Sequence, residues 1–143
     1  MPSGPPIAPP IGMELAAVAR VVGRAFDEAL TAAGGSRPTW LVLLSLKTRP
    51  VANQRELAAA VGIQGATLTH HLNGMESDGL LTRRRDPENR RVHLVELTEA
   101  GETAFHRLRL AAAEHDERLR AGFDATDLDR LRELLDRLRN NVL

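Results

Sequence analysis

The chain has 143 residues, a length that suits a single domain. Its 19 basic and 19 acidic residues balance, so total charge indicates no partner, and the lack of cysteine excludes disulfides, thiolate zinc sites and thiol redox sensing. Hydrophobic residues make up 43% of the sequence but aromatic residues only 3%, so we expect helices packed around Leu, Val and Ala.

Residues 1–10 are rich in proline and lack the basic start and apolar run of a signal peptide. We expect them to form a disordered or extended tail, followed by one domain over residues 11–143. No apolar stretch approaches the roughly 20 residues that a membrane span needs. We therefore expect a soluble, cytoplasmic protein.

Two helices are predicted at the start of the domain. The first covers residues 11–33 and ends at Gly34-Gly35; its apolar residues recur every three or four positions, at Leu15, Val18, Val22, Phe26 and Leu30. Ser36 is a suitable N-cap for the next helix, with Pro38 just inside it. Residues 39–47 of that helix are nearly all apolar, so we expect it to be central and buried.

Two shorter helices follow, separated by a few residues that include Gly62. Asn53 can cap the first, and the second carries Leu68, Leu72 and Met75 on one face before it ends at Gly79. Such a pair is the signature of a helix-turn-helix, although similar pairs occur by chance in helical proteins.

A strongly basic hairpin is predicted next. Residues 80–85 and 91–97 have strand character, and the intervening sequence DPEN favours a turn. The segment RRRDPENRR contains five arginines, and residues 37–95 hold nine basic and five acidic residues, against ten and fourteen in the remainder. A basic hairpin after a helix-turn-helix indicates a DNA-binding wing; a solvated surface hairpin is the alternative.

Two amphipathic helices complete the chain. Thr98 caps the first, and Thr126 or Asp127 starts the second. Their apolar stripes are Phe105, Leu108, Ala112, His115 and Leu119, then Leu128, Leu131, Leu134, Leu135 and Leu138. The middle of the chain is too small to cover these faces, which favours a second copy as the partner. We expect a mostly α fold with a small β-hairpin wing, in which a DNA-binding core (residues 37–98) is flanked by dimerisation helices (residues 11–34 and 99–143).

From Ile11 to the C-terminus this order of elements resembles the MarR family of bacterial regulators. The motifs that carry the resemblance are Leu57-Ala58, Gly65-Ala66-Thr67, Gly79-Leu80, Asp86-Pro87, Arg90-Arg91 and Leu97-Thr98-Glu99-Ala100-Gly101. The resemblance implies a homodimer formed by the first and last helices. It also implies binding to palindromic operators in double-stranded DNA, and release by a small aromatic or phenolic ligand.

Two positions depart from the family pattern. Asn89 stands where many members have an aspartate that helps to hold a wing arginine, so the resemblance leaves the rigidity of the wing open. His70 stands where many members have an arginine in the recognition helix.

The helical period places a hydrogen-bonding surface opposite Leu68. Ala66, His70, Asn73 and Ser77 face outward with Thr69 beside them, whereas His71 borders the buried face and is interpreted as structural. Hydroxyl, amide and imidazole groups can meet base edges in a major groove, and an alanine can touch a thymine methyl. The predicted DNA-facing residues of this helix are Gln64, Ala66, Thr67, Thr69, His70 and Asn73.

The wing arginines are expected to contact different parts of the DNA. Arg90 and Arg91 lie nearest the tip, so we expect one of them to enter the minor groove, whose negative potential attracts arginine. Arg83, Arg84 and Arg85 are better placed for phosphates. Part of this cluster can instead be merely solvated.

Other kinds of site find little support in the sequence. The histidines lack metal-ligand spacing, and no nucleophile–base or paired-carboxylate arrangement stands out, so we expect no metal, no cofactor and no enzyme activity. Phe26, Trp40 and Leu44 are candidates for a ligand pocket, with ordinary core as the alternative. The functional hypotheses are a repressor released by a small aromatic ligand, a constitutive or architectural DNA binder, and a winged helix used for protein contacts.

Overall fold

The computed structural model describes residue 4 and residues 7–143, and this part of the chain folds into six helices and a three-stranded antiparallel sheet. The mostly α fold with a small hairpin wing is thereby confirmed. Of the predicted tail, residues 1–3, 5 and 6 lie outside the described residues, and residues 7–10 are exposed and irregular. No helix in the described part is long and apolar enough to cross a membrane.

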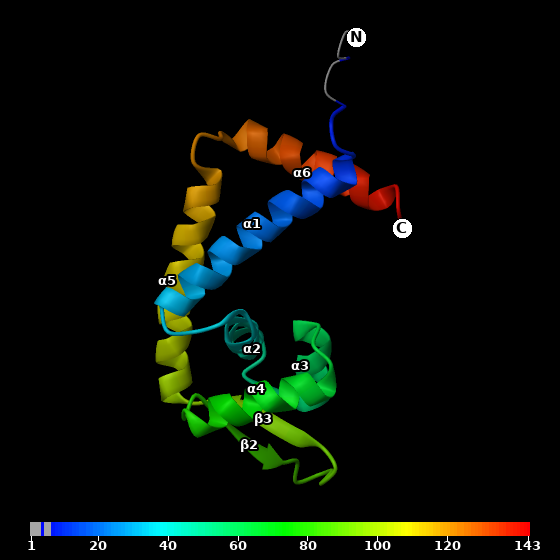
Figure 1. Cartoon of the computed structure of the whole chain (residues 1–143). Coiled ribbons are helices and arrows are strands. Elements are labelled where there is room, and N and C mark those ends of the chain that lie inside the picture. Colours follow the sequence, from blue (N-terminus) through cyan, green and yellow to red (C-terminus); the bar gives the residue numbers. More distant parts are fainter. Residues whose placement is uncertain (1–3, 5–6) are drawn as a thin grey trace.

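The helices α1 (Ile11–Ala32), α5 (Glu99–Arg120) and α6 (Ala125–Asn140) form the upper part of the molecule in Figure 1. α1 packs against α5, and α6 leaves the far end of α5 in a new direction. The start predicted for α6 is wrong by one or two residues. Asp124 is its N-cap because Asp124 and Asp127 each accept a backbone N–H from the other.

The helix α2 (Arg37–Thr48) lies at the centre of the core, as its composition predicts. The Ser36 side chain accepts the backbone N–H of Thr39 and caps the helix. Val42, Leu43 and Leu46 are fully buried. α2 contacts α1, α3, α4, α5 and β3, so it joins the upper helices to the lower half of the molecule.

The helices α3 (Gln54–Val61) and α4 (Gly65–Ser77) form the predicted helix-turn-helix. The Asn53 side chain accepts the backbone N–H of Glu56 and caps α3. Gly62 then adopts a left-handed φ of 74°, which favours glycine and lets the chain turn into α4. Leu68, Leu72 and Met75 bury the inner face of α4, so its opposite face is solvent-exposed.

The sheet has the strand order β1-β3-β2, with β1 (Val51–Asn53), β2 (Leu81–Arg85) and β3 (His93–Leu97). The two hairpin strands were predicted, although each begins one or two residues later than expected. β1 was not predicted, because three residues are too few to show a period. It forms by pairing Ala52 with the buried Val95 of β3.

An apolar surface on the upper helices is left exposed in the single chain. No side chain of α6 is buried, and Leu131, Leu134 and Leu135 are each at least 39% exposed. On α1, Leu15 and Val18 are likewise exposed. The apolar stripes of these two helices are therefore only partly covered within one chain, since Leu30 of α1 is buried whereas these residues are exposed.

Candidate nucleic-acid interface

The outer face of α4 presents small and hydrogen-bonding side chains to solvent. Ala66, Thr67, His70 and Asn73 are all exposed. Gln64 occupies the N-cap position, is exposed, and makes no side-chain capping bond among the described residues. These residues can therefore approach a major groove without rearranging the core.

Thr69 differs from this group because its hydroxyl is already engaged. It accepts a hydrogen bond from Gln54 Nε2 at 2.7 Å and donates to the Gly65 carbonyl at 2.9 Å. The side chain is half-buried and ties α4 to α3. Thr69 thus helps to fix the angle between the two helices, a role that its sequence position did not reveal.

The two adjacent histidines have different environments. His70 is exposed and His71 is half-buried, and their ring centroids lie 5.7 Å apart. Across the described residues, no group of three or more His, Cys, Asp or Glu side chains is arranged to hold a metal ion. Of these two histidines, only the exposed His70 is therefore accessible to a macromolecule.

The tip of the wing is held by its own side chains. Asp86 Oδ1 accepts the backbone N–H of Glu88, and Asn89 Oδ1 accepts that of Arg91. Arg85 Nη1 donates to the Arg90 carbonyl at 3.1 Å. Asn89 therefore contributes to the turn although the family often has aspartate there, and the exposed Arg90 and Arg91 are carried on an ordered hairpin.

Arg83 is bonded to side chains of α4, whereas the hydrogen bond of Arg85 stays within the wing. Its side chain is only 17% exposed, and Nη2 donates to Glu76 Oε1 at 3.0 Å and to Asn73 Oδ1 at 2.5 Å. The hydrogen bond from Arg83, together with its charge, holds the pKa of Glu76 below its ordinary value. Arg83 was expected to contact phosphates, but here it joins the wing to α4.

The reason for this difference lies in the register of the sheet. Arg83 pairs with the buried Val95, so its side chain starts on the face of β2 that α4 covers. Arg84 and Arg85 are exposed, and Arg84 Nε lies 3.9 Å from Glu96 Oε2. At that distance in solvent the Arg84 pair is weak, so Arg84 can exchange its partner for a phosphate.

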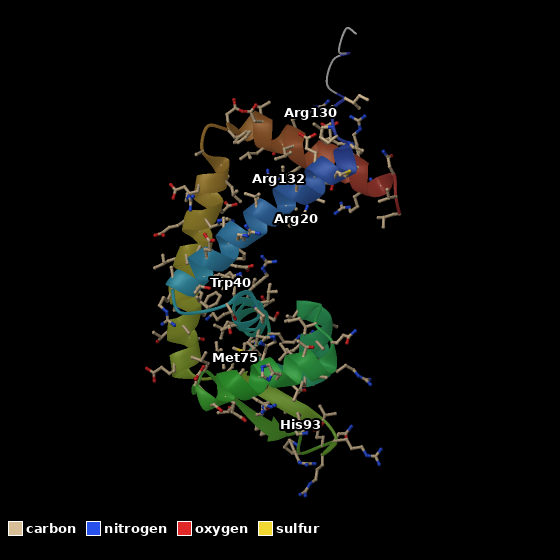
Figure 2. The ribbon with its side chains drawn as sticks, in the orientation of Figure 1. Arg20, Trp40, Met75, His93, Arg130 and Arg132 are labelled. Carbon is tan, nitrogen blue, oxygen red and sulfur yellow. The ribbon has the colours of Figure 1, made fainter. Side chains whose placement is uncertain are left out.

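A groove of about 890 Å³ runs between α3, α4 and the wing. It brings Arg55, Arg91 and His93 together with Thr69 and Arg83. Figure 2 shows His93 on the wing, at the end of the molecule farthest from α6. Gln54, Arg55 and His93 were not predicted as site residues; a cation at the start of the helix before α4 was the signal in the sequence that could have indicated Arg55.

Two of the three candidate pocket residues, Phe26 and Leu44, line different cavities. Phe26 lines a cavity of about 500 Å³ between α1, α2 and α5. Trp40, near the start of α2, stacks on Phe105 of α5 with ring centroids 5.6 Å apart (Figure 2). Leu44 is 40% exposed and lines a separate cavity of about 370 Å³ against α3.

The cavity at Phe26 combines apolar walls with two charged side chains, Arg37 and Asp116. Val22 and Leu41 line it, and the Phe26 ring lies 5.1 Å from that of the buried His115. Arg37 also lines it, with Nε donating to Asp27 at 2.9 Å and Nη2 to the Gly23 carbonyl at 2.9 Å. Arg37 therefore links the start of α2 to α1 at the edge of this cavity.

Comparisons with known proteins agree with this geometry. The MarR family model matches residues 36–93. The HTH-type transcriptional regulator YdgJ of Bacillus subtilis (strain 168) is 33% identical over 129 residues, which cover 90% of this chain and 77% of YdgJ.

Solved structures extend the likeness to the whole fold. The transcriptional repressor CouR, bound to a 23-mer DNA duplex, has a TM-score of 0.81 and 27% identity over 91% of this chain and 92% of CouR. A mutant MarR from E. coli complexed with operator DNA has a TM-score of 0.79 over 90% and 93% of the two chains, and at 23% identity it speaks for the fold alone. The chain thus belongs to the MarR family of winged helix-turn-helix transcriptional regulators.

Proposed function

We propose that this regulator binds a palindromic operator as a homodimer and acts as a repressor. The observation that carries the proposal is the single surface formed by the exposed polar face of α4 and the ordered, arginine-bearing wing. Its likeness to CouR, a repressor bound to duplex DNA, supports this choice over a winged helix used for protein contacts. Because a regulator acts where the chromosome is, we assign it to the cytoplasm.

In this proposal each element has a distinct contact. α4 enters the major groove, where Gln64, Thr67 and His70 meet base edges and Ala66 meets a thymine methyl. Arg90 or Arg91 enters the minor groove. Arg84 and Arg85, joined by Arg55 from the groove, neutralise phosphates and position the protein.

Operator binding is tested by selecting genomic fragments with the purified protein and measuring their affinity over a range of salt concentrations. We expect an inverted-repeat motif and an affinity that falls steeply with salt, because cations are released from each neutralised phosphate. An unenriched pool with salt-independent affinity would instead support a protein-interaction module.

We further infer that a small aromatic acid releases the operator by binding at the Phe26 cavity. Its apolar walls suit an aromatic ring, and Arg37 offers a guanidinium to a carboxylate. A ligand that recruits Arg37 competes with Asp27 and the Gly23 carbonyl for the guanidinium. Ligand binding thereby alters the contact between α1 and α2. A ligand shifts DNA affinity only if it binds one arrangement of these helices more tightly than the other.

Salicylate serves as the probe for this second proposal. We expect it to quench the fluorescence of Trp40, the only tryptophan, and to lower operator affinity over the same concentration range. Ala112→Leu fills the cavity and is expected to abolish both effects, whereas Ala113→Leu, on the neighbouring exposed position, keeps them. Since the chain has no cysteine, peroxide is not expected to release the protein from its operator. An operator affinity that no aromatic acid changes would favour a constitutive DNA binder.

A further inference from the structure

The side-chain amide of Asn73 is held in one orientation by Arg83. We propose that this contact directs the amide nitrogen of Asn73, rather than its oxygen, toward the DNA, so that Asn73 prefers a base presenting an acceptor, such as guanine, over the two-bond contact with adenine. The inference rests on the proposed operator binding and assigns the specificity of one position within it.

The orientation follows from the chemistry of the two groups. A guanidinium has five N–H donors and no acceptor, so only the oxygen of an amide can face it. Arg83 Nη2 lies 2.5 Å from Asn73 Oδ1. The amide N–H₂ of Asn73 is therefore the end left for another partner, and Asn73 is exposed on the outer face of α4.

Arg83 is itself restrained, which makes the orientation persistent. One carboxylate oxygen of Glu76 accepts from Arg83 Nη2 and the other accepts the Arg83 backbone N–H, both at 3.0 Å. The Arg83 side chain is 17% exposed, against 52% for that of Arg84, and β2 fixes its backbone against β3. Glu76 thus anchors Arg83 from two sides while Arg83 holds Asn73.

The contact with Arg83 limits the hydrogen bonds by which Asn73 can recognise a base. Asparagine recognises adenine with two bonds, accepting from N6–H₂ through its oxygen and donating to N7 through its nitrogen. Because Arg83 already engages one lone pair of this oxygen and lies against it, the bond from adenine N6–H₂ must compete with the guanidinium for the same atom. Guanine O6 and N7 are both acceptors, as is thymine O4, so an amide that presents its nitrogen favours these edges over the amino groups of adenine and cytosine.

The test compares motifs selected from a random duplex library by the wild-type protein and by Asn73→Ala, Arg83→Met and Arg83→Lys. We expect wild type to enrich guanine or thymine at one position of each half-site, and Asn73→Ala to lose about fivefold or more preference at that position alone. Arg83→Met frees the amide oxygen and is expected to raise adenine there. Arg83→Lys keeps a donor against Oδ1 and retains the wild-type base.

Each outcome decides the matter. An Arg83→Met motif identical to that of wild type, or adenine enriched by wild type at the position that depends on Asn73, overturns the inference while leaving operator binding intact. So does an Asn73→Ala motif with no position altered. If wild type enriches no motif, the proposed function fails and the inference with it. Denaturation midpoints of the four proteins, measured in parallel, identify any variant that is not folded.

Discussion

Gly101 illustrates how one residue sets the position of an element. A Cβ at this position would lie 2.0 Å from the Leu80 carbonyl oxygen and 2.7 Å from Leu97 Cδ1. Thr98, the N-cap of α5, donates its hydroxyl to the Gly79 carbonyl at 2.6 Å and its backbone N–H to the Leu80 carbonyl at 3.1 Å. The Leu-Thr-x-x-Gly motif therefore lets the start of α5 lie directly on the chain that leaves α4.

Gly101→Ala is accordingly expected to lower the free energy of unfolding by about 1–3 kcal/mol, because backbone atoms must move to admit the methyl group. Urea denaturation measures the change. The matched control is Gly74→Ala on α4, where the added Cβ meets nothing within 4 Å beyond its chain neighbours and its own helix backbone. That control is expected to gain up to about 1 kcal/mol from higher helix propensity. Equal midpoints for the two variants would contradict this account of the motif.

At the scale of elements, the wing and α4 present different chemistry to DNA. The wing tip offers the exposed guanidinium groups of Arg90 and Arg91, which respond to charge and groove width. The outer face of α4 carries no arginine or lysine, and offers His70 and uncharged groups that respond to base identity. Affinity for any DNA and discrimination among sequences are therefore expected to depend on different elements.

The double variant Arg90→Ala with Arg91→Ala is expected to weaken binding to operator and random DNA alike, and to flatten the salt dependence by about one or two ions. His70→Ala is expected to weaken operator binding while leaving random DNA nearly unaffected. Fluorescence anisotropy at several salt concentrations separates the two effects. The control Arg109→Ala with Arg118→Ala removes the same charge from exposed positions on α5 and should leave the salt slope unchanged. Parallel losses in the wing and helix variants would refute this division.

At the scale of the whole molecule, the exposed apolar faces of α1 and α6 favour packing against another protein surface. Leu131, Leu134 and Leu135 recur at helical spacing on α6, and Leu15 and Val18 do so on α1. Two recognition helices must also reach successive major grooves about 34 Å apart to read a palindrome. A second copy of the chain meets both requirements at once.

The protein is therefore expected to have the mass of a dimer by light scattering, and Leu131→Asp with Leu135→Asp is expected to give a folded monomer. The reason is that charged groups on this surface cannot be desolvated against a partner. Arg132→Ala, which removes only an exposed ion pair with Asp129 on the same helix, should leave the dimer intact. A monomeric mass for the unaltered protein would refute the prediction.

Much of the architecture followed from the sequence because its signals act between near neighbours. The caps at Ser36, Asn53 and Thr98 each bind a backbone N–H three residues on, and Gly62 ends a helix by its own φ. Apolar periodicity likewise chose the buried face of α4. Such interactions depend on spacing along the chain, which the sequence states directly.

Contacts between distant segments were decided only by the tertiary structure. β1 forms because β3 lies beside it. Phe26, Trp40 and Leu44 lie apart because α2 packs against several neighbouring elements. The sequence placed Arg83 in a basic wing, yet it could not show that sheet register turns this side chain toward Asn73 and Glu76. The charge of an arginine follows from the sequence, whereas its hydrogen-bond partners depend on which groups the fold brings close to it.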